Sequence, residues 1–140
     1  MRYTLVAVLV LCLAGFACAQ GGPCTADVID HGKIQLADDA FMYMTPFGKP
    51  VIGKGSIHDT AGQKFGKRTN VKRSWENDHR IVVSPAGDMG YEAGTMAMSY
   101  DEDQKTVSFK AVVLTVYKAK NGACEQVAGT MEPLQEADRK

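Results

Sequence analysis

Residues 75–95, WENDHRIVVSPAGDMGYEAGT, decide the fold of this chain. Side chains alternate in character with a period of two over 71–83, which predicts a strand. The SPAGD segment at 84–88 is typical of a turn, and a second strand is expected over 89–100. The stretch therefore predicts an antiparallel hairpin with long arms.

The residues after this hairpin predict two more strands. Residues 106–118 are the most β-like of the chain and have apolar side chains on both faces, so both faces are expected to be covered. Asn121 and Gly122 are a preferred pair for a tight hairpin turn, which places the last strand over 123–131. Glycines inside these strands are positions where the sheet can bend: Gly90, Gly94 and Gly129.

The residues before the hairpin predict a strand pair and a helix. Strands are expected over 40–45 and 51–52, with a proline-containing turn between them. The helix should begin at Ser56, because Ser56 and Asp59 have the spacing of a capping box. Apolar residues recur every four positions on its predicted buried face: Ile57, Ala61 and Phe65. The expected fold class is α+β, a curved antiparallel sheet wrapped on this helix as a cone-like barrel.

The first nineteen residues have the features of a cleavable secretory signal peptide. Arg2 precedes an apolar run over 5–16, and residues 17–19 have the small-x-small pattern that signal peptidase recognises. The run is shorter than the about 20 residues that span a bilayer. We therefore expect cleavage after Ala19, and a secreted or periplasmic protein without a membrane span in the mature chain.

The cysteines offer alternatives. Cys18 could carry a lipid, although Gly15 stands where lipoprotein signals usually have leucine. After cleavage, Cys24 and Cys124 would either pair in the oxidising compartment or remain free thiols, and a pair would close a loop of about 100 residues. No metal site is expected, because two distant cysteines and three scattered histidines show no ligand spacing.

The mature chain is expected to form one domain over 37–133, after a leader over 20–36 and before a polar tail over 134–140. Thr25 could cap a short helix in the leader, or the segment could be a loop. The sequence has 16 Lys and Arg residues and 16 Asp and Glu residues, a balance that argues against a nucleic-acid binder. No phosphate-binding glycine loop or nucleophile motif occurs, so no cofactor is expected.

Three stretches resemble the SnoaL-like and ketosteroid-isomerase-like superfamily, which has the nuclear-transport-factor-two fold. They are ADDAFMYMTPFGKPVIGKGSI at 37–57, WENDHRIVVSPAGDMGYEAGT at 75–95 and VLTVYKAKNGA at 113–123. The resemblance covers about residues 37–131 and rests on the order and spacing of these stretches. It implies a cone-shaped barrel around a pocket, in a branch of unknown function. Members include isomerases, cyclases, dehydratases and binding modules, so the fold does not supply a function.

Three departures from the family pattern bear on function. The N-terminal helices that close the cone are shortened here to residues 25–36 or missing. Thr45 stands where the isomerases have their catalytic aspartate, and threonine cannot abstract a proton at neutral pH. The second acid of the isomerases falls at Val113 or Leu114, both apolar. The steroid-isomerase residues are therefore absent.

The remaining candidates are a few titratable and aromatic residues. His79, Asp38 and Asp39 are candidate general bases, with a surface histidine and solvated turn carboxylates as the structural alternatives. An enzyme would need His79 in the pocket with a carboxylate within hydrogen-bond reach. Strand alternation sends Tyr91 and Glu92 to opposite faces, so only one of them can line a pocket. Candidates to line the pocket, or alternatively to fill the core, are Tyr43, Trp75, Tyr91 and Met96.

The leading hypothesis is an exported binding or interaction module with an apolar pocket for a small ligand. Such a module could also form a homodimer through its open sheet. The alternative is a small lyase, cyclase or isomerase that acts on an apolar substrate and uses His79, Asp38 or Asp39 as its base.

Overall fold

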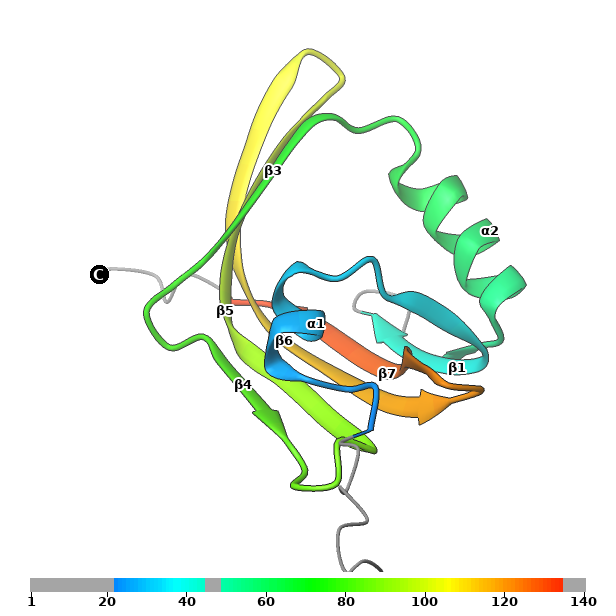
Figure 1. Ribbon diagram of the computed structural model, residues 1–140. Helices are drawn as coiled ribbons and strands as arrows, with labels where there is room; N and C mark the ends of the chain where they lie inside the picture. The colour runs from blue at the N-terminus through cyan, green and yellow to red at the C-terminus, as the bar shows by residue number, and fades with distance from the viewer. Residues whose placement is uncertain (1–21, 45–48, 135–140) are drawn as a thin grey trace, which may run out of the picture.

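A computed structural model describes residues 22–44 and 49–134 of this chain. The signal peptide over 1–19, the expected turn at 45–48 and residues 135–140 of the tail lie outside the described residues. The described elements, seven strands and two helices, are α1 Ala26–His31, β1 Gln35–Met44, β2 Val51–Ile52, α2 Lys54–Phe65, β3 Thr69–Trp75, β4 Arg80–Val83, β5 Met89–Glu102, β6 Lys105–Lys120 and β7 Ala123–Pro133 (Figure 1).

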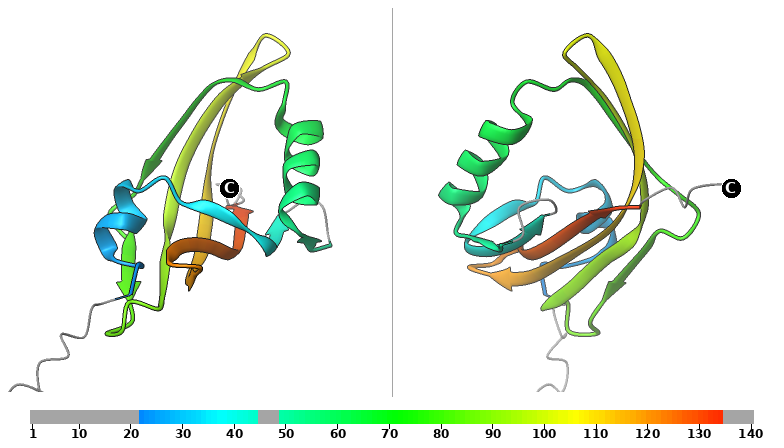
Figure 2. Two further views of the ribbon diagram at one scale, coloured as in Figure 1. Left: turned by 45° about the vertical axis from the view of Figure 1, so that its right-hand side comes forward. Right: turned by 180° about the vertical axis from the view of Figure 1, so that it is seen from behind.

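The strands form one curved, open sheet. Its order is β2-β1-β7-β6-β5-β3, and β4 pairs with β5 as well. Strands β1 and β7 run parallel, whereas the other pairs are antiparallel, so the sheet is mixed rather than purely antiparallel. Figure 2 shows that the sheet bends around one side, on which both helices lie. The predicted α+β class and curved sheet are confirmed, but the sheet does not close into a barrel.

The strand expected over 71–83 is two strands, β3 and β4, with a turn at 76–79 between them. The carboxylate of Asp78 holds this turn, because it accepts hydrogen bonds from the backbone N–H of Thr95 at 2.9 Å and from its hydroxyl at 2.7 Å. These hydrogen bonds keep the pKa of Asp78 below its ordinary value. Residues 76–79 lie opposite Gly94 and Thr95 of β5 and form a bulge. The side chains keep the same alternation between the two faces before and after this bulge. A period-two pattern in the sequence therefore does not reveal it.

The helices confirm one capping prediction and overturn another. Thr25 caps α1, since its hydroxyl accepts the backbone N–H of Val28 at 3.1 Å. Helix α2 begins at Lys54 rather than Ser56, because Gly53, at a φ of 89°, turns the chain directly out of β2. No side chain caps α2, so the predicted capping box at Ser56 is wrong. Neither helix of the described part has the length and apolar character that a membrane crossing requires.

Two clusters of buried side chains hold the helices to the concave face of the sheet. The cluster under α1 contains Cys24, Ile29, Tyr117 and Cys124. The cluster under α2 contains Ala37, Ala40 and Ile57. A disulfide joins Cys24 to Cys124 across a sequence separation of 100, so the two cysteines are not free thiols. The disulfide fastens the segment before α1 to β7.

The outer face of the sheet carries exposed apolar side chains, so the prediction that both faces of 106–118 are covered is wrong. The helices lie on the concave side alone, and Val112 and Leu114 of β6 are exposed on the other. On this outer face, an apolar row of residues that are paired with one another across neighbouring strands crosses five strands: Phe41, Ala128, Val116, Tyr91 and Val82.

Candidate functional site

A cavity of about 520 Å³ lies on the concave face, between α2 and the sheet. Its volume is within the range of small-molecule sites, about 300–1,000 Å³. Helix α2 lines it with the apolar residues that recur every four positions: Ile57, Ala61 and Phe65. The sheet supplies most of the remaining apolar wall: Met42, Trp75, Met96, Met98, Tyr100 and Val113.

A wider hollow of about 960 Å³ lies along β3, β5 and β6, near Leu134. Much of its lining is polar or basic and includes Lys72, Ser99 and Lys110. It is more open to solvent than the concave cavity, and no buried ionisable side chain lines it. We therefore place the candidate site on the concave face.

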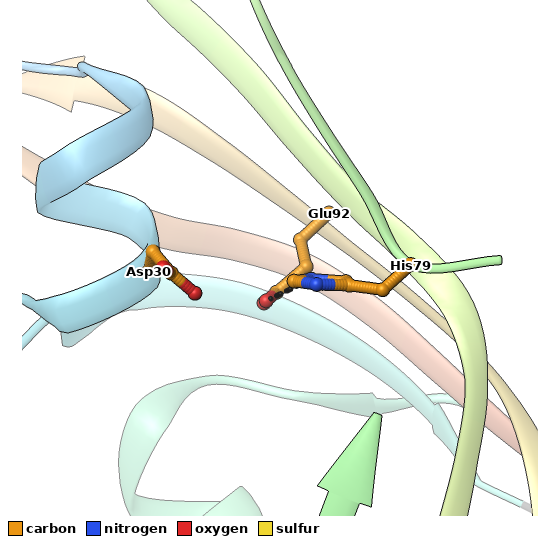
Figure 3. A group of neighbouring side chains, drawn as sticks. All are labelled: Asp30, His79 and Glu92. Atoms are coloured by element: carbon orange, nitrogen blue, oxygen red, sulfur yellow. Dashed lines mark hydrogen bonds and ion pairs between the residues drawn. The ribbon is translucent and has the colours of Figure 1, made fainter. Parts of the chain in front are cut away.

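Among the residues that the structure describes, Glu92 is the buried charged residue, with 9% of the residue exposed. It lines the concave cavity. The Nε2 of His79 lies 2.9 Å from its Oε1 (Figure 3). The hydroxyl of Tyr117 donates a hydrogen bond to its Oε2 at 2.8 Å. An ionised carboxylate can only accept hydrogen bonds, so with Glu92 charged the Nε2 of His79 carries a proton.

Tyr117 is a permanent donor in this group. Burial raises the pKa of its hydroxyl above the ordinary value of 10.0, and the hydrogen bond to Glu92 and the charge of Glu92 raise the pKa further. The hydroxyl therefore stays protonated at neutral pH and fixes one oxygen of Glu92.

Two glycines flank Glu92 on its own face of β5 and make room for its partners. A Cβ on Gly94 would lie 2.9 Å from the Cα of His79, closer than such atoms pack. A Cβ on Gly90 would lie 2.8 Å from the Cδ1 of Ile29 in α1. The pattern Gly-x-Glu-x-Gly thus lets the turn at 76–79 and helix α1 approach the carboxylate from two sides.

The imidazole of His79 stacks on the indole of Trp75, with ring centroids 4.2 Å apart and planes inclined by 9°. In the part of the chain that the structure describes, Trp75 and Glu92 line the cavity and His79 does not. Glu92 is therefore the member of the pair that a bound molecule would meet, with His79 behind it.

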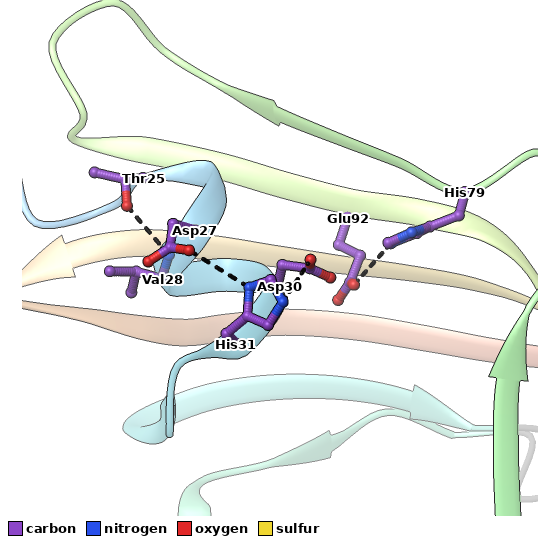
Figure 4. Close-up of polar contacts among 7 residues, drawn as sticks. All are labelled: Thr25, Asp27, Val28, Asp30, His31, His79 and Glu92. Carbon is purple, nitrogen blue, oxygen red and sulfur yellow. Dashed lines mark hydrogen bonds and ion pairs between the residues drawn. The ribbon is translucent and has the colours of Figure 1, made fainter.

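Helix α1 brings two more carboxylates and a second histidine to this region (Figure 4). His31 lies 3.3 Å from Asp30 and 3.5 Å from Asp27. Asp30, His79 and Glu92 each place one potential metal-ligand atom within 4.8 Å of the others. The spacing of these residues along the sequence does not predict this group, because its members come from three separate elements.

At the basic side of the cavity, the guanidinium of Arg68 lies between two aromatic rings. Its Cζ is 4.4 Å from the ring centroid of Phe65 and 3.9 Å from that of Tyr100. Its Nε is 3.7 Å from a carboxylate oxygen of Glu102, which is an ion pair rather than a hydrogen bond. This Nε is buried and has no hydrogen-bond acceptor among the described residues.

Comparison with known proteins identifies the fold. No protein-family model and no curated protein matches the chain. An NTF2-like protein from Cytophaga hutchinsonii is similar over 72% of this chain and 78% of its own, with a TM-score of 0.52 and 22% identity. A ketosteroid isomerase-like protein from Erwinia carotovora atroseptica is similar over 72% and 77%, with a TM-score of 0.59 and 10% identity.

A third solved structure, an NTF2-like protein with a cystatin-like fold from Novosphingobium aromaticivorans, matches 74% of this chain and 67% of its own, with a TM-score of 0.55 and 9% identity. The chain has the NTF2-like fold. At these identities the likeness concerns the fold, and it confirms the fold that the three stretches imply. Within the described residues, the helix on the N-terminal side is short, since α1 has six residues.

Within this NTF2-like fold, the candidate pocket residues separate by face. Trp75 and Met96 line the cavity. Tyr43 and Tyr91 are 42% and 41% exposed and lie on the outer face, because strand alternation turns Tyr91 away from Glu92. The sequence left open which of Tyr91 and Glu92 would face a pocket, and the structure places Glu92 there.

Asp38 and Asp39 lie outside the cavity. Both are exposed on β1, beside an irregularity in its pairing with β7. Asp39 accepts a hydrogen bond from the ammonium group of Lys120, and this contact lowers the pKa of Asp39. Neither carboxylate is positioned to act on a molecule in the cavity. Thr45 lies outside the described residues.

Proposed function

We propose that this protein is exported and binds a small, largely apolar molecule in the concave cavity, with a hydrogen-bond-accepting or acidic group of the ligand at Arg68. The observation that carries the proposal is a cavity of about 520 Å³ whose walls are mainly apolar and aromatic. Small-molecule sites in proteins combine such walls with a few placed polar groups. Methionines in the wall would adapt to an irregular ligand.

Arg68 is the reason to expect an acidic group on this ligand. Its stacked guanidinium is held in place, yet its buried Nε lacks an acceptor among the described residues. A buried donor without a partner costs about 1–3 kcal/mol. A carboxylate or similar acceptor on the ligand would remove this cost, and a matched neutral ligand would remove less of it.

The test is thermal unfolding of the mature protein with aromatic and aliphatic carboxylic acids and with the matching alcohols. We expect an acid to raise the melting temperature, since a ligand that binds only the folded state at 100 times its Kd stabilises by about 2.7 kcal/mol. Val113→Trp should abolish the shift by filling the cavity. Val112→Trp, on the opposite face of the same strand, is the matched control and should retain it.

Arg68→Met should remove the preference for acids over alcohols while alcohols still bind. The proposal fails if no compound in either series shifts the wild type. It also fails if Val113→Trp binds as tightly as Val112→Trp, because the ligand would then lie elsewhere.

Export is supported by the Cys24–Cys124 disulfide, since disulfides persist in oxidising compartments. The corresponding test is the mass of the native product. A chain beginning at Gln20 is expected, whereas a lipid on Cys18 or an uncleaved Ala19–Gln20 bond would contradict cleavage by signal peptidase at this site.

A second candidate function is proton transfer, as in a lyase, cyclase or isomerase, and the pairing of His79 with Glu92 favours it. Glu92 would accept the proton from an apolar substrate, because it reaches the cavity wall, and His79 would position the carboxylate. Glu92→Gln should then abolish turnover while ligand binding persists. Asp39→Asn serves as the control and should leave turnover unchanged.

A further inference from the structure

We propose that Asp30, His79 and Glu92 form a binding site for one divalent transition-metal ion, with zinc as the fitting occupant, beside the concave cavity. This inference does not rest on the proposed ligand binding, because Arg68 and the apolar wall take no part in it and it is tested with the metal alone.

The geometry requires little rearrangement. The Nε2 of His79 and the Oε1 of Glu92 are already 2.9 Å apart, and one oxygen of Asp30 completes a group whose atoms lie within 4.8 Å of one another (Figure 3). Zinc binds nitrogen and oxygen ligands at about 2.0–2.2 Å in a tetrahedron, which separates the ligand atoms by about 3.4 Å. The widest pair would therefore close by up to about 1.4 Å, and the His79–Glu92 pair would open by about 0.5 Å. The Asp30 side chain, 45% exposed on a short helix, has room to make that movement.

The donor set suits a transition metal. One imidazole nitrogen and two carboxylate oxygens are the ligand types that zinc accepts, whereas calcium and magnesium prefer oxygen alone. Two carboxylates balance the charge of a divalent cation, and without a cation their charges repel within 4.8 Å. On binding, His79 would give up its Nε2 proton to solvent and use that nitrogen as the ligand.

The surrounding contacts orient the ligands. The hydroxyl of Tyr117 holds the second oxygen of Glu92, and the stack on Trp75 fixes the ring plane of His79. His31 lies 3.3 Å from Asp30. Outer partners of this kind commonly hold metal ligands in place, and losing one costs about 10–100-fold in affinity.

The site would be open rather than closed. Three protein ligands leave the fourth tetrahedral position to water or to another molecule, as in zinc sites that act on a ligand. Because Glu92 also lines the cavity, that position would lie near the cavity edge. A bound metal would thus connect helix α1 to the site on the sheet.

The test uses tag-free mature protein stripped with a chelator, titrated with zinc chloride, and separately with manganese, magnesium and calcium chlorides. Calorimetry should show one zinc per chain and weaker binding of magnesium and calcium. Trp75, the only tryptophan of the sequence, should change its fluorescence in the same titration, because it stacks on a proposed ligand.

The Asp30→Asn and His79→Gln variants should each weaken zinc binding by at least about tenfold. Asp27→Asn is the matched control, because it removes the same charge from the same helix and also removes an ion pair with His31, and it should bind zinc as the wild type does. Asp30 is exposed, so its variant is expected to fold, and circular dichroism would verify this.

Three results would overturn the proposal. The first is that no binding of one zinc ion per chain is observed, which would mean that Asp30, His79 and Glu92 form only ion pairs and hydrogen bonds with one another. Asp30→Asn could bind as the wild type does, or Asp27→Asn could lose as much affinity as Asp30→Asn, which would indicate diffuse charge attraction. None of these results would affect the thermal-shift test of the cavity.

Discussion

The Nε2 of His79 lies 2.9 Å from the Oε1 of Glu92, although strand β4 and the turn at 84–88 separate the two residues in the chain. The contact exists because the bulge at 76–79 folds over β5 where Gly94 has no side chain. Asp78 holds that bulge through Thr95. The pair therefore depends on the backbone path around it as much as on its own chemistry.

Gly94→Ala is expected to destabilise the protein by about 1–3 kcal/mol, as overpacking of a filled site does. The added Cβ would lie 2.9 Å from the backbone of His79, which cannot withdraw without breaking the turn. Urea unfolding measures the change. Gly62→Ala, in α2 with open space around it, is the control and should stabilise by up to about 1 kcal/mol. Equal stability of Gly94→Ala and wild type would contradict the close approach.

Tyr117 should make stability depend on pH in alkaline solution. The folded state raises the pKa of its hydroxyl above 10.0, so it holds the proton more tightly than the unfolded chain does. The stabilising contribution of this hydroxyl to the free energy of unfolding is complete below pH 10. It is lost as the pH rises above 10, by up to about 1.4 kcal/mol per pH unit. Urea unfolding of wild type and Tyr117→Phe between about pH 9 and 11 measures the difference. Parallel pH profiles would show that the hydroxyl is not held as the structure indicates.

Removal of the disulfide should cost about 2–5 kcal/mol of unfolding free energy. The double variant Cys24→Ser, Cys124→Ser would lengthen the free chain in the unfolded state and loosen α1, which packs on this bond. Urea unfolding of the variant should match that of reduced wild type. If reductant leaves the wild-type midpoint unchanged, the bond does not form in the native protein.

Two copies of the chain are expected to associate through the apolar row on the outer face. Tyr91 stands within that row, between Val116 and Val82, and its exposed ring would be covered by a second sheet. Gel filtration should show a dimer for the wild type and a monomer for Tyr91→Lys. Ser99→Lys, at the polar end of the same face and strand, should remain dimeric. A monomeric wild type at micromolar concentration would exclude this assembly.

Local chemistry predicted the long strands and their turns well. Asn121 adopts a φ of 51° and Gly122 one of 78° in the expected hairpin turn, where these residue types tolerate positive angles. The helix face of α2 was also predictable, because a period of four fixes which residues face inward. The break between β3 and β4 was not, since it depends on hydrogen bonds from Asp78 to Thr95, far along the chain.

By itself, the sequence determined the α+β class, the alternation of side chains along the strands and the inward face of α2, because periodicity and turn residues act between near neighbours. It also offered His79 as a candidate and left its partner open. Only the tertiary structure decided that Glu92 faces the cavity with His79, Tyr117 and Asp30 around it. Those contacts join a helix, a turn and two strands. Their formation depends on how the sheet curves, on the room that Gly94 leaves for the backbone of His79 and on the room that Gly90 leaves for the side chain of Ile29. The spacing of residues along the chain does not show these features.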